Sequence, residues 1–251
     1  MKIVFLTALG VGGASIMGAA LGFVFKDISK KFSNVVLAFA AGVMLCASVV
    51  SLIMPSLEYT NRFPVLVTTI GIICGALCID FADKFVPHLH KLAGVDENGN
   101  FADNQNLTRV LLFVLAIAIH NLPEGIAAGV GFGTGNATEA ITIALGIALQ
   151  NIPEGMVIIS PMLNAGVSKG RTFFAATLAG IVEVFGTLIG YFAVSLSNAI
   201  LPFALAFAGG TMLYVISRDM IPETHADGSH AVTYSLLVGF IVMLAIGYYL
   251  G

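Results

Sequence analysis

The sequence predicts an all-α polytopic membrane protein of eight transmembrane helices, with residues 1–251 forming a single transmembrane domain. Hydrophobic residues make up 58% of the 251 positions and charged residues only 10%, whereas soluble domains carry about 25% charged residues. The mean hydropathy is +0.97. The net charge is −3 and no basic patch suggests a nucleic-acid partner. We therefore expect the lipid bilayer to surround the chain.

Eight apolar stretches are long enough to cross a bilayer, which takes about 20 residues as a helix. They cover residues 3–25, 33–57, 64–86, 108–133, 138–163, 171–195, 199–220 and 232–250. The first stretch is too long for the apolar part of a signal peptide, about 7–15 residues, so we interpret it as a membrane span. Residues 87–107 are rich in Gly, Asn and Asp, and are expected to form a flexible cytoplasmic loop.

The basic residues predict the orientation of the chain in the cell membrane. Eight spans place both termini on one side, and cytoplasmic loops carry an excess of Lys and Arg. One side holds most of these residues, namely Lys26, Lys30, Lys31, Lys84, Lys91, Arg109, Lys169, Arg171 and Arg218. The other side holds Lys2 and Arg62. Both termini are therefore expected to be extracytoplasmic.

One polar frame occurs twice inside the apolar stretches. It reads HNLPEG from His120 in the fourth span and QNIPEG from Gln150 in the fifth. In each copy the first residue and the glutamate, Glu124 or Glu154, are four positions apart and share a helix face. Because a short turn joins the two spans, we expect the two copies to face each other within the membrane.

Amides and prolines complete each copy of the frame. Asn121 and Asn151 lie one residue round the helix and widen the polar stripe. Pro123 and Pro153 lack an N–H, so each frees the carbonyl four residues earlier. A freed carbonyl at membrane depth needs a partner such as a side chain, water or an ion. Each frame therefore gathers oxygen and nitrogen ligands inside the bilayer.

Three carboxylates lie deep within the predicted spans: Glu124, Glu154 and Glu183. An ionised carboxylate at the bilayer centre costs several kcal/mol unless it is paired, and no Lys or Arg lies in the middle of a span. The positive partner is then a proton or a bound cation. For Glu183 an alternative is a protonated, hydrogen-bonded glutamate that serves only the packing of the bundle.

The available ligands indicate which cations would bind. One imidazole with carboxylates and amides suits the divalent transition metals Zn²⁺, Fe²⁺, Mn²⁺ and Cd²⁺. Oxygen and amide ligands hold such ions less tightly than thiolates, and transport needs binding that is weak enough for release. The ions are expected as cargo, and no cofactor is expected.

The two frames resemble those of the ZIP (Zrt/Irt-like) family of divalent-metal transporters, in its prokaryotic type, and the resemblance covers essentially the whole chain. It implies eight spans, extracytoplasmic termini and a binuclear metal site on spans four and five. It also implies that spans 1–3 and 6–8 are inverted repeats. The sequence adds weak support, because spans two and seven both end with a proline and a glutamate, in "SLIMPSLE" and "SRDMIPETH".

The same resemblance implies two sets of ligands. One ion would be held by His120, Glu124, Gln150 and Glu154, with Met44 of span two. The other would be held by Asn121, Glu124, Asn151, Glu154 and Glu183. Gln150 stands where the family often has histidine, and Asn151 where some relatives have an acid, so both reduce the ligand strength. Met44 has packing as its alternative role.

Four polar residues on the predicted cytoplasmic side could receive ions that leave the site: His88, His90, Glu223 and His225. Their alternative role is that of solvated loop residues.

Inward transport of divalent metal ions, zinc first, is the function that these features favour. A membrane-embedded metalloenzyme would predict HExxH or several intramembrane histidines, but the spans hold only His120. A proton-coupled solute carrier would use the glutamates as relays, commonly with intramembrane arginine, which is missing. We expect a multi-pass transporter without enzyme activity, whose partners are metal ions and lipid, with a homodimer as a further option.

Overall fold

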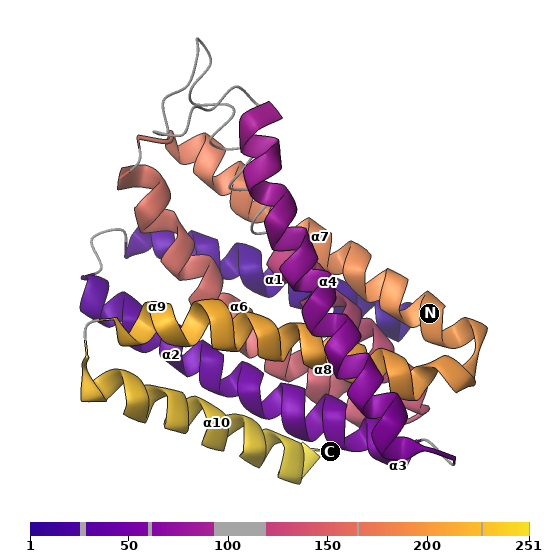
Figure 1. Ribbon diagram of the computed structural model, residues 1–251. Helices are drawn as coiled ribbons and strands as arrows, with labels where there is room; N and C mark the ends of the chain where they lie inside the picture. Colours follow the sequence, from indigo (N-terminus) through magenta and orange to yellow (C-terminus); the bar gives the residue numbers. More distant parts are fainter. Residues whose placement is uncertain (26–28, 60–61, 93–118, 165, 227, 251) are drawn as a thin grey trace.

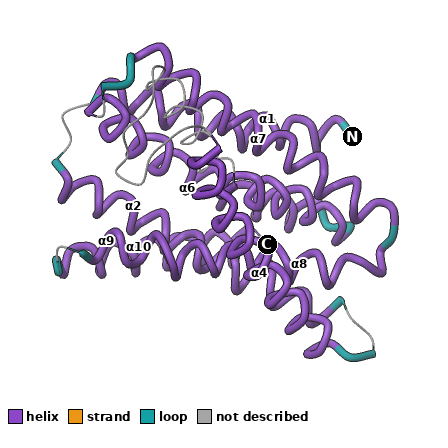
Figure 2. Tube along the Cα trace, turned by 45° about the horizontal axis from the view of Figure 1, so that its top comes forward, coloured by secondary structure: helices purple, strands orange, loops and turns teal. Residues whose placement is uncertain are grey.

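The computed structural model describes residues 1–25, 29–59, 62–92, 119–164, 166–226 and 228–250. Within these ranges only the backbone is described at 83, 85–92, 161 and 198. The described residues form helices joined by short turns, and none of them lies in a strand (Figures 1 and 2). The predicted all-helical class is confirmed.

Seven helices of the described residues are long and apolar enough to cross a membrane. They are Lys2–Val24, Lys30–Glu58, Pro64–Ala82, Ala137–Asn164, Lys169–Leu196, Leu201–His225 and His230–Leu250. Of the predicted fourth span, the described part is a helix over 119–130, named helix 119–130 below, and a 3₁₀ turn, η2 (Gly131–Thr134). The count of eight spans therefore stays a prediction.

Five of the long helices are regular: α1 (Lys2–Val24), α4 (Pro64–Leu92), α6 (Ala137–Asn164), α7 (Lys169–Leu196) and α10 (His230–Leu250). A short 3₁₀ turn, η3 (Asn198–Ile200), follows α7. In Figure 1, α1 begins and α10 ends in the right-hand half of the view. The α4 helix continues through Leu92, beyond the predicted end of the third span at 86. Hydropathy marks where a chain leaves lipid and not where its backbone hydrogen bonds end, which explains the difference.

The second and seventh spans each contain a π-helical segment, whose turns are wider than those of an α-helix. The second consists of α2 (Lys30–Cys46), the π-helix η1 (Ala47–Ile53) and α3 (Met54–Glu58). The seventh consists of α8 (Leu201–Val215), the π-helix η4 (Ile216–Met220) and α9 (Ile221–His225). Both π-helices come directly before a short helix with proline in its first turn, Pro55 or Pro222. A π turn is a recurrent place where a long helix absorbs such a disruption.

Glycines mark the places where helices cross most closely. Gly75 of α4 lies against the carbonyl of Phe207 in α8, and Gly210 of α8 lies against the carbonyl of Ile72 in α4. A Cβ at either glycine would overlap the neighbouring backbone. The crossings of α2 with α10 and of α1 with α7 are built in the same way, from Gly42, Gly239, Gly12 and Gly180. Small residues at crossings are typical of helices packed in lipid.

The remaining close crossings position the polar frames. Helix 119–130 packs on α7, and α6 packs on α1. Gly125 and Gly155, the last residues of the two frames, lie against the backbones of Glu183 and Ser15. Each frame therefore ends in a glycine that lets a third or fourth helix approach the preceding glutamate. This packing brings α1 and α7 to the carboxylates.

Candidate metal-binding site

Glu183 of α7 is the centre of the polar residues inside the bundle. Its side chain is fully buried and accepts hydrogen bonds from three other helices. Ser15 Oγ of α1 donates to Glu183 Oε1 at 2.7 Å, and Asn151 Nδ2 of α6 donates to Oε2 at 2.6 Å. Asn121 Nδ2 of helix 119–130 also donates to Oε1. Glu183 thus joins α1, α6, α7 and helix 119–130.

The two frame glutamates lie close to this centre. Glu124 is 2% exposed, and its carboxylate lies within electrostatic range of those of Glu154 and Glu183. Among the described residues, no hydrogen-bond partner reaches Glu124 Oε2 or Glu154 Oε1, both of which are buried. Buried oxygens without a partner lose their solvation without compensation. A cation would provide the missing interaction for both.

The amides of the second frame add further oxygens. Gln150 is fully buried beside Glu124, and neither terminal atom of its amide makes a hydrogen bond of normal geometry within the described ranges. Asn151 Oδ1 is likewise buried without such a partner there, while its Nδ2 reaches Glu183 and the carbonyl of Val11. Carboxylate and amide oxygens are thus presented together.

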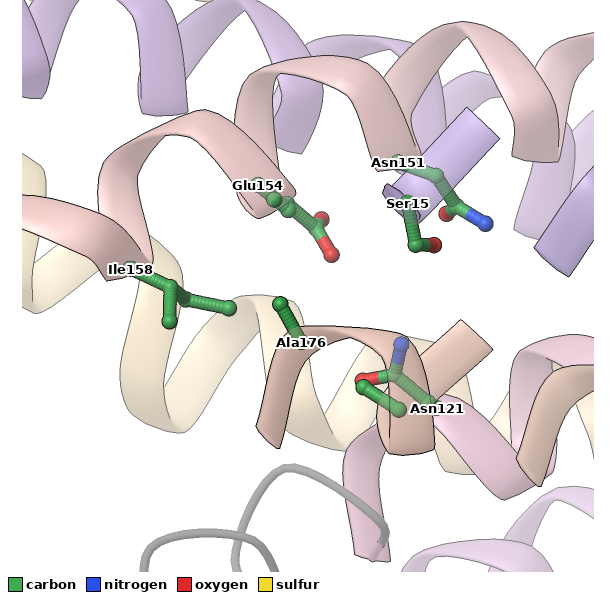
Figure 3. Close-up of a pocket in the computed structure, with 8 residues that line it drawn as sticks. Ser15, Asn121, Asn151, Glu154, Ile158 and Ala176 are labelled. Carbon is green, nitrogen blue, oxygen red and sulfur yellow. The ribbon is translucent and has the colours of Figure 1, made fainter. Parts of the chain in front are cut away.

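A small cavity lies between these groups. Ser15, Asn121, Asn151 and Glu154 line it, with Gly155 and the apolar residues Ile158, Ala176 and Ala179. Figure 3 shows the polar side chains directed toward a shared space. About 20 Å³ is open to the centre of a water molecule, and a single water needs roughly 10–15 Å³ on this measure. The cavity therefore has room for one water or one small ion.

The structure does not gather all the predicted ligands at this cavity. His120 Nε2 lies 3.7 Å from Asp219 Oδ2 of η4, and Met44 is buried in the largest apolar cluster, where it packs with residues such as Ala127 and Ile147. In the part of the chain that the structure describes, no three His, Cys, Asp or Glu side chains form a metal-binding group. An ion would therefore depend on the amides as well as on the carboxylates.

Two residues near the site belong to no recognisable sequence motif and were not predicted. Ser15 is one of two hydroxyl residues in its apolar stretch, the other being Thr7, and Asp219 follows Arg218 near the end of a span. Their roles depend on which helix lies opposite, so pattern alone gave no signal for them.

The predicted exit residues have different surroundings. Glu223 lines a cavity in which about 360 Å³ is open to the centre of a water molecule, between α1, α2, α6 and α9. Both ring nitrogens of His225 have partners, because Nδ1 lies 3.0 Å from the Ile221 carbonyl and Nε2 lies 3.3 Å from Thr233 Oγ1. His88 and His90 lie outside the described side chains. Of the two exit residues whose side chains are described, Glu223 is the one that lines this cavity.

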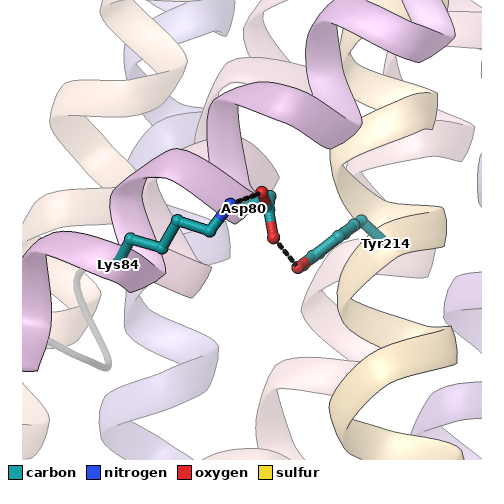
Figure 4. Close-up of polar contacts among 3 residues, drawn as sticks. All are labelled: Asp80, Lys84 and Tyr214. Atoms are coloured by element: carbon teal, nitrogen blue, oxygen red, sulfur yellow. Dashed lines mark hydrogen bonds and ion pairs between the residues drawn. The ribbon is translucent and has the colours of Figure 1, made fainter.

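A second polar group links α4 to α8 away from the cavity. Asp80 Oδ1 accepts a hydrogen bond from the Tyr214 hydroxyl at 2.8 Å, and Oδ2 pairs with Lys84 (Figure 4). The side chain of Asp80 is 32% exposed, so this carboxylate lies at the edge of the bundle. Its partners distinguish it from the frame glutamates, each of which has one buried oxygen without a hydrogen-bond partner among the described residues.

The fold and the buried groups define a class: a multi-pass helical membrane protein with carboxylates and amides that converge inside the bundle. Comparison with known proteins identifies the family. The family model described as "ZIP Zinc transporter" matches residues 88–247. The chain is 37% identical to "Zinc transporter GufA" of Myxococcus xanthus, over 98% of both chains.

Other relatives cover the chain almost as fully. It is 34% identical to "Zinc transporter ZupT" of Chlorobaculum parvum, over 96% of this chain and 95% of that one. It is 32% identical to "Zinc transporter ZIP11" of Homo sapiens, over 95% and 94% respectively. The chain belongs to the ZIP zinc transporter family, as the two frames predicted.

Proposed function

We propose that the protein carries divalent transition-metal ions, zinc first, into the cytoplasm through a site on helix 119–130 and α6. The observation that carries this proposal is the set of buried oxygens without a hydrogen-bond partner among the described residues, on Glu124, Gln150, Asn151 and Glu154. Charged groups inside a membrane bundle commonly mark an ion path. The names of the relatives support zinc as the cargo.

The site would hold two ions that share the frame glutamates. The first would lie with Glu124, Gln150 and Glu154, and His120 would have to turn from Asp219 to join it. The second would lie on the side of Asn121, Asn151 and Glu183, near the small cavity. Oxygen and amide ligands suit Zn²⁺, Cd²⁺, Fe²⁺ and Mn²⁺ and allow release.

The path would run toward the side that carries most of the basic residues. The cavity beside Glu223 lies at that end of α1 and α2, with Lys30 and Asn34 in its lining. Ions leaving the site would pass Glu223 there. Both termini would then be extracytoplasmic, in the cell membrane, in agreement with the excess of Lys and Arg at this end.

Inverted repeats would account for two pairs of matching features. In such an arrangement α4 corresponds to α10 and the second span to the seventh. The packing of α4 on α8 then corresponds to that of α10 on α2. The π-helices before Pro55 and Pro222 would correspond as well. A common transporter plan places the ion site between such repeats.

Uptake of ⁶⁵Zn²⁺ into proteoliposomes tests the proposal, with Cd²⁺, Fe²⁺ and Mn²⁺ as competitors. Glu124→Ala and Glu154→Ala should each abolish uptake, because the ion loses a shared carboxylate. Glu139→Ala is the matched control, since Glu139 begins the same helix as Glu154 but pairs with Tyr59 and Asn136 at the turn. If both frame variants fold and still take up Zn²⁺ at the normal rate, the transport proposal is wrong.

A further inference from the structure

Ser15 contributes the one hydroxyl among the three donors that hold Glu183. Its Oγ lies 2.7 Å from Oε1, and the side chain is 5% exposed. The other two donors are the amides of Asn121 and Asn151. Oε1 thus receives two hydrogen bonds and Oε2 one. The carboxylate is fixed from two sides before any ion arrives.

Each of the two amides turns its nitrogen toward the carboxylate of Glu183. An ionised carboxylate can only accept hydrogen bonds, so the Nδ2 atoms of Asn121 and Asn151 point at Glu183. A metal ion binds the amide oxygen instead. An ion that takes the place of an amide nitrogen on Glu183 breaks that hydrogen bond, and the amide must turn before its own oxygen can face the ion.

The bond from Ser15 is different in this respect. A carboxylate oxygen has two lone pairs, so Oε1 can keep the hydroxyl on one while the other binds an ion. Ser15 is also held in place independently of the amides, because its backbone oxygen lies against Gly155 of α6. Its hydroxyl can therefore remain on Glu183 when both amides have turned.

We propose that Ser15 is a positioning residue that holds Glu183 in place for the second metal ion. This inference rests on the proposed function and names the residue of α1 that makes the second position usable. Outer partners of ligands commonly change metal affinity 10–100-fold when they are removed. Without the hydroxyl, Glu183 has no fixed donor once the amides turn, so the second ion binds about tenfold more weakly. The first ion, on Glu124, Gln150 and Glu154, is unaffected.

The test is a calorimetric Zn²⁺ titration of the full-length protein in detergent. The wild type should show two binding events. Ser15→Ala should weaken the second event about tenfold and leave the first unchanged. Ser56→Ala is the matched control, since it removes a buried hydroxyl that bonds to Ile53 and Thr68 in another part of the bundle. It should change neither event.

A second pair of variants separates the hydroxyl from the shape of the side chain. Ser15→Thr and Ser15→Val have nearly the same shape, so both variants add the same bulk beside the cavity and differ only in the hydroxyl. The valine variant should bind the second ion about tenfold more weakly than the threonine variant. This comparison also applies if the alanine variant does not fold.

The outcomes distinguish the two proposals. Equal second events in the threonine and valine variants, or a wild type with a single event that Ser15→Ala leaves unchanged, would overturn the role of Ser15 and leave transport intact. Weakening of both events together by Ser15→Ala, with a lowered melting temperature, would also overturn it, as the effect would then be general. A wild type that binds no Zn²⁺ and transports none would overturn the proposed function itself.

Discussion

The Nε2 atom of His120 lies 3.7 Å from Oδ2 of Asp219, so the histidine of the first frame faces η4 and does not line the small cavity beside Glu154. An imidazole that is to bind an ion with Glu124 must first leave this carboxylate. The pair therefore competes with the ion for His120.

Asp219→Asn should strengthen the binding of the first Zn²⁺ ion. The neutral amide attracts the imidazole less, and a partly exposed contact of this kind contributes at most about 1 kcal/mol, which corresponds to an affinity gain of up to about fivefold. A Zn²⁺ titration measures it, with Asp80→Asn as the control because Asp80 pairs with Tyr214 and Lys84. Weaker binding in Asp219→Asn would show instead that Asp219 orients His120 as a ligand.

Gln150→His should raise the affinity for the first ion and slow its release. Imidazole is a stronger ligand than a carboxamide for Zn²⁺, and position 150 is fully buried beside Glu124. We expect a lower Kd for Zn²⁺ with a lower maximal uptake rate, and a greater preference for Zn²⁺ over Mn²⁺ in competition. Unchanged affinity would mean that residue 150 is not a ligand.

Gly18→Ala should destabilise the protein, while Gly13→Ala in the same helix should not. A Cβ at Gly18 would overlap the carbonyl of Ile152, whereas a Cβ at Gly13 meets nothing within 4 Å. Overpacking of this kind costs about 1–3 kcal/mol, and the added Cβ at Gly13 should stabilise the helix by about 0.5–1 kcal/mol. Thermal unfolding in detergent compares the two. Equal melting temperatures would mean that α1 moves away from α6 at little cost.

Much of the fold follows from the sequence because hydropathy is a local property. The apolar stretches mark the seven long helices. The π turns were not predicted, since they depend on how the backbone absorbs Pro55 and Pro222 within a long helix. The helical continuation of α4 to Leu92 was missed because leaving lipid does not end a helix.

Part of the candidate site could likewise be predicted from the sequence, and part could not. Glu124, Glu154 and their amides stand out because polar groups in apolar sequence are costly without a purpose. Glu183 was considered both as a metal ligand and as a hydrogen-bonded packing residue. It lies beside the frame carboxylates, and each of its carboxylate oxygens accepts a hydrogen bond within the bundle. The orientation of His120 and the contribution of Ser15 depend on the helix that packs opposite, and no pattern within one span contains that information.

The bond between Ser15 and Glu183 joins residues 168 positions apart in the chain. Ribosomes add about 5–20 residues each second, so roughly 8–34 s separate the synthesis of the two partners. A nascent chain that has emerged only as far as α6 already carries Glu124 and Glu154 into the bilayer, without the carboxylate that gathers Asn121 and Asn151. The hydrogen-bonded cluster around Glu183 is consequently completed late in biogenesis, when α7 inserts beside a helix that was the first to be made.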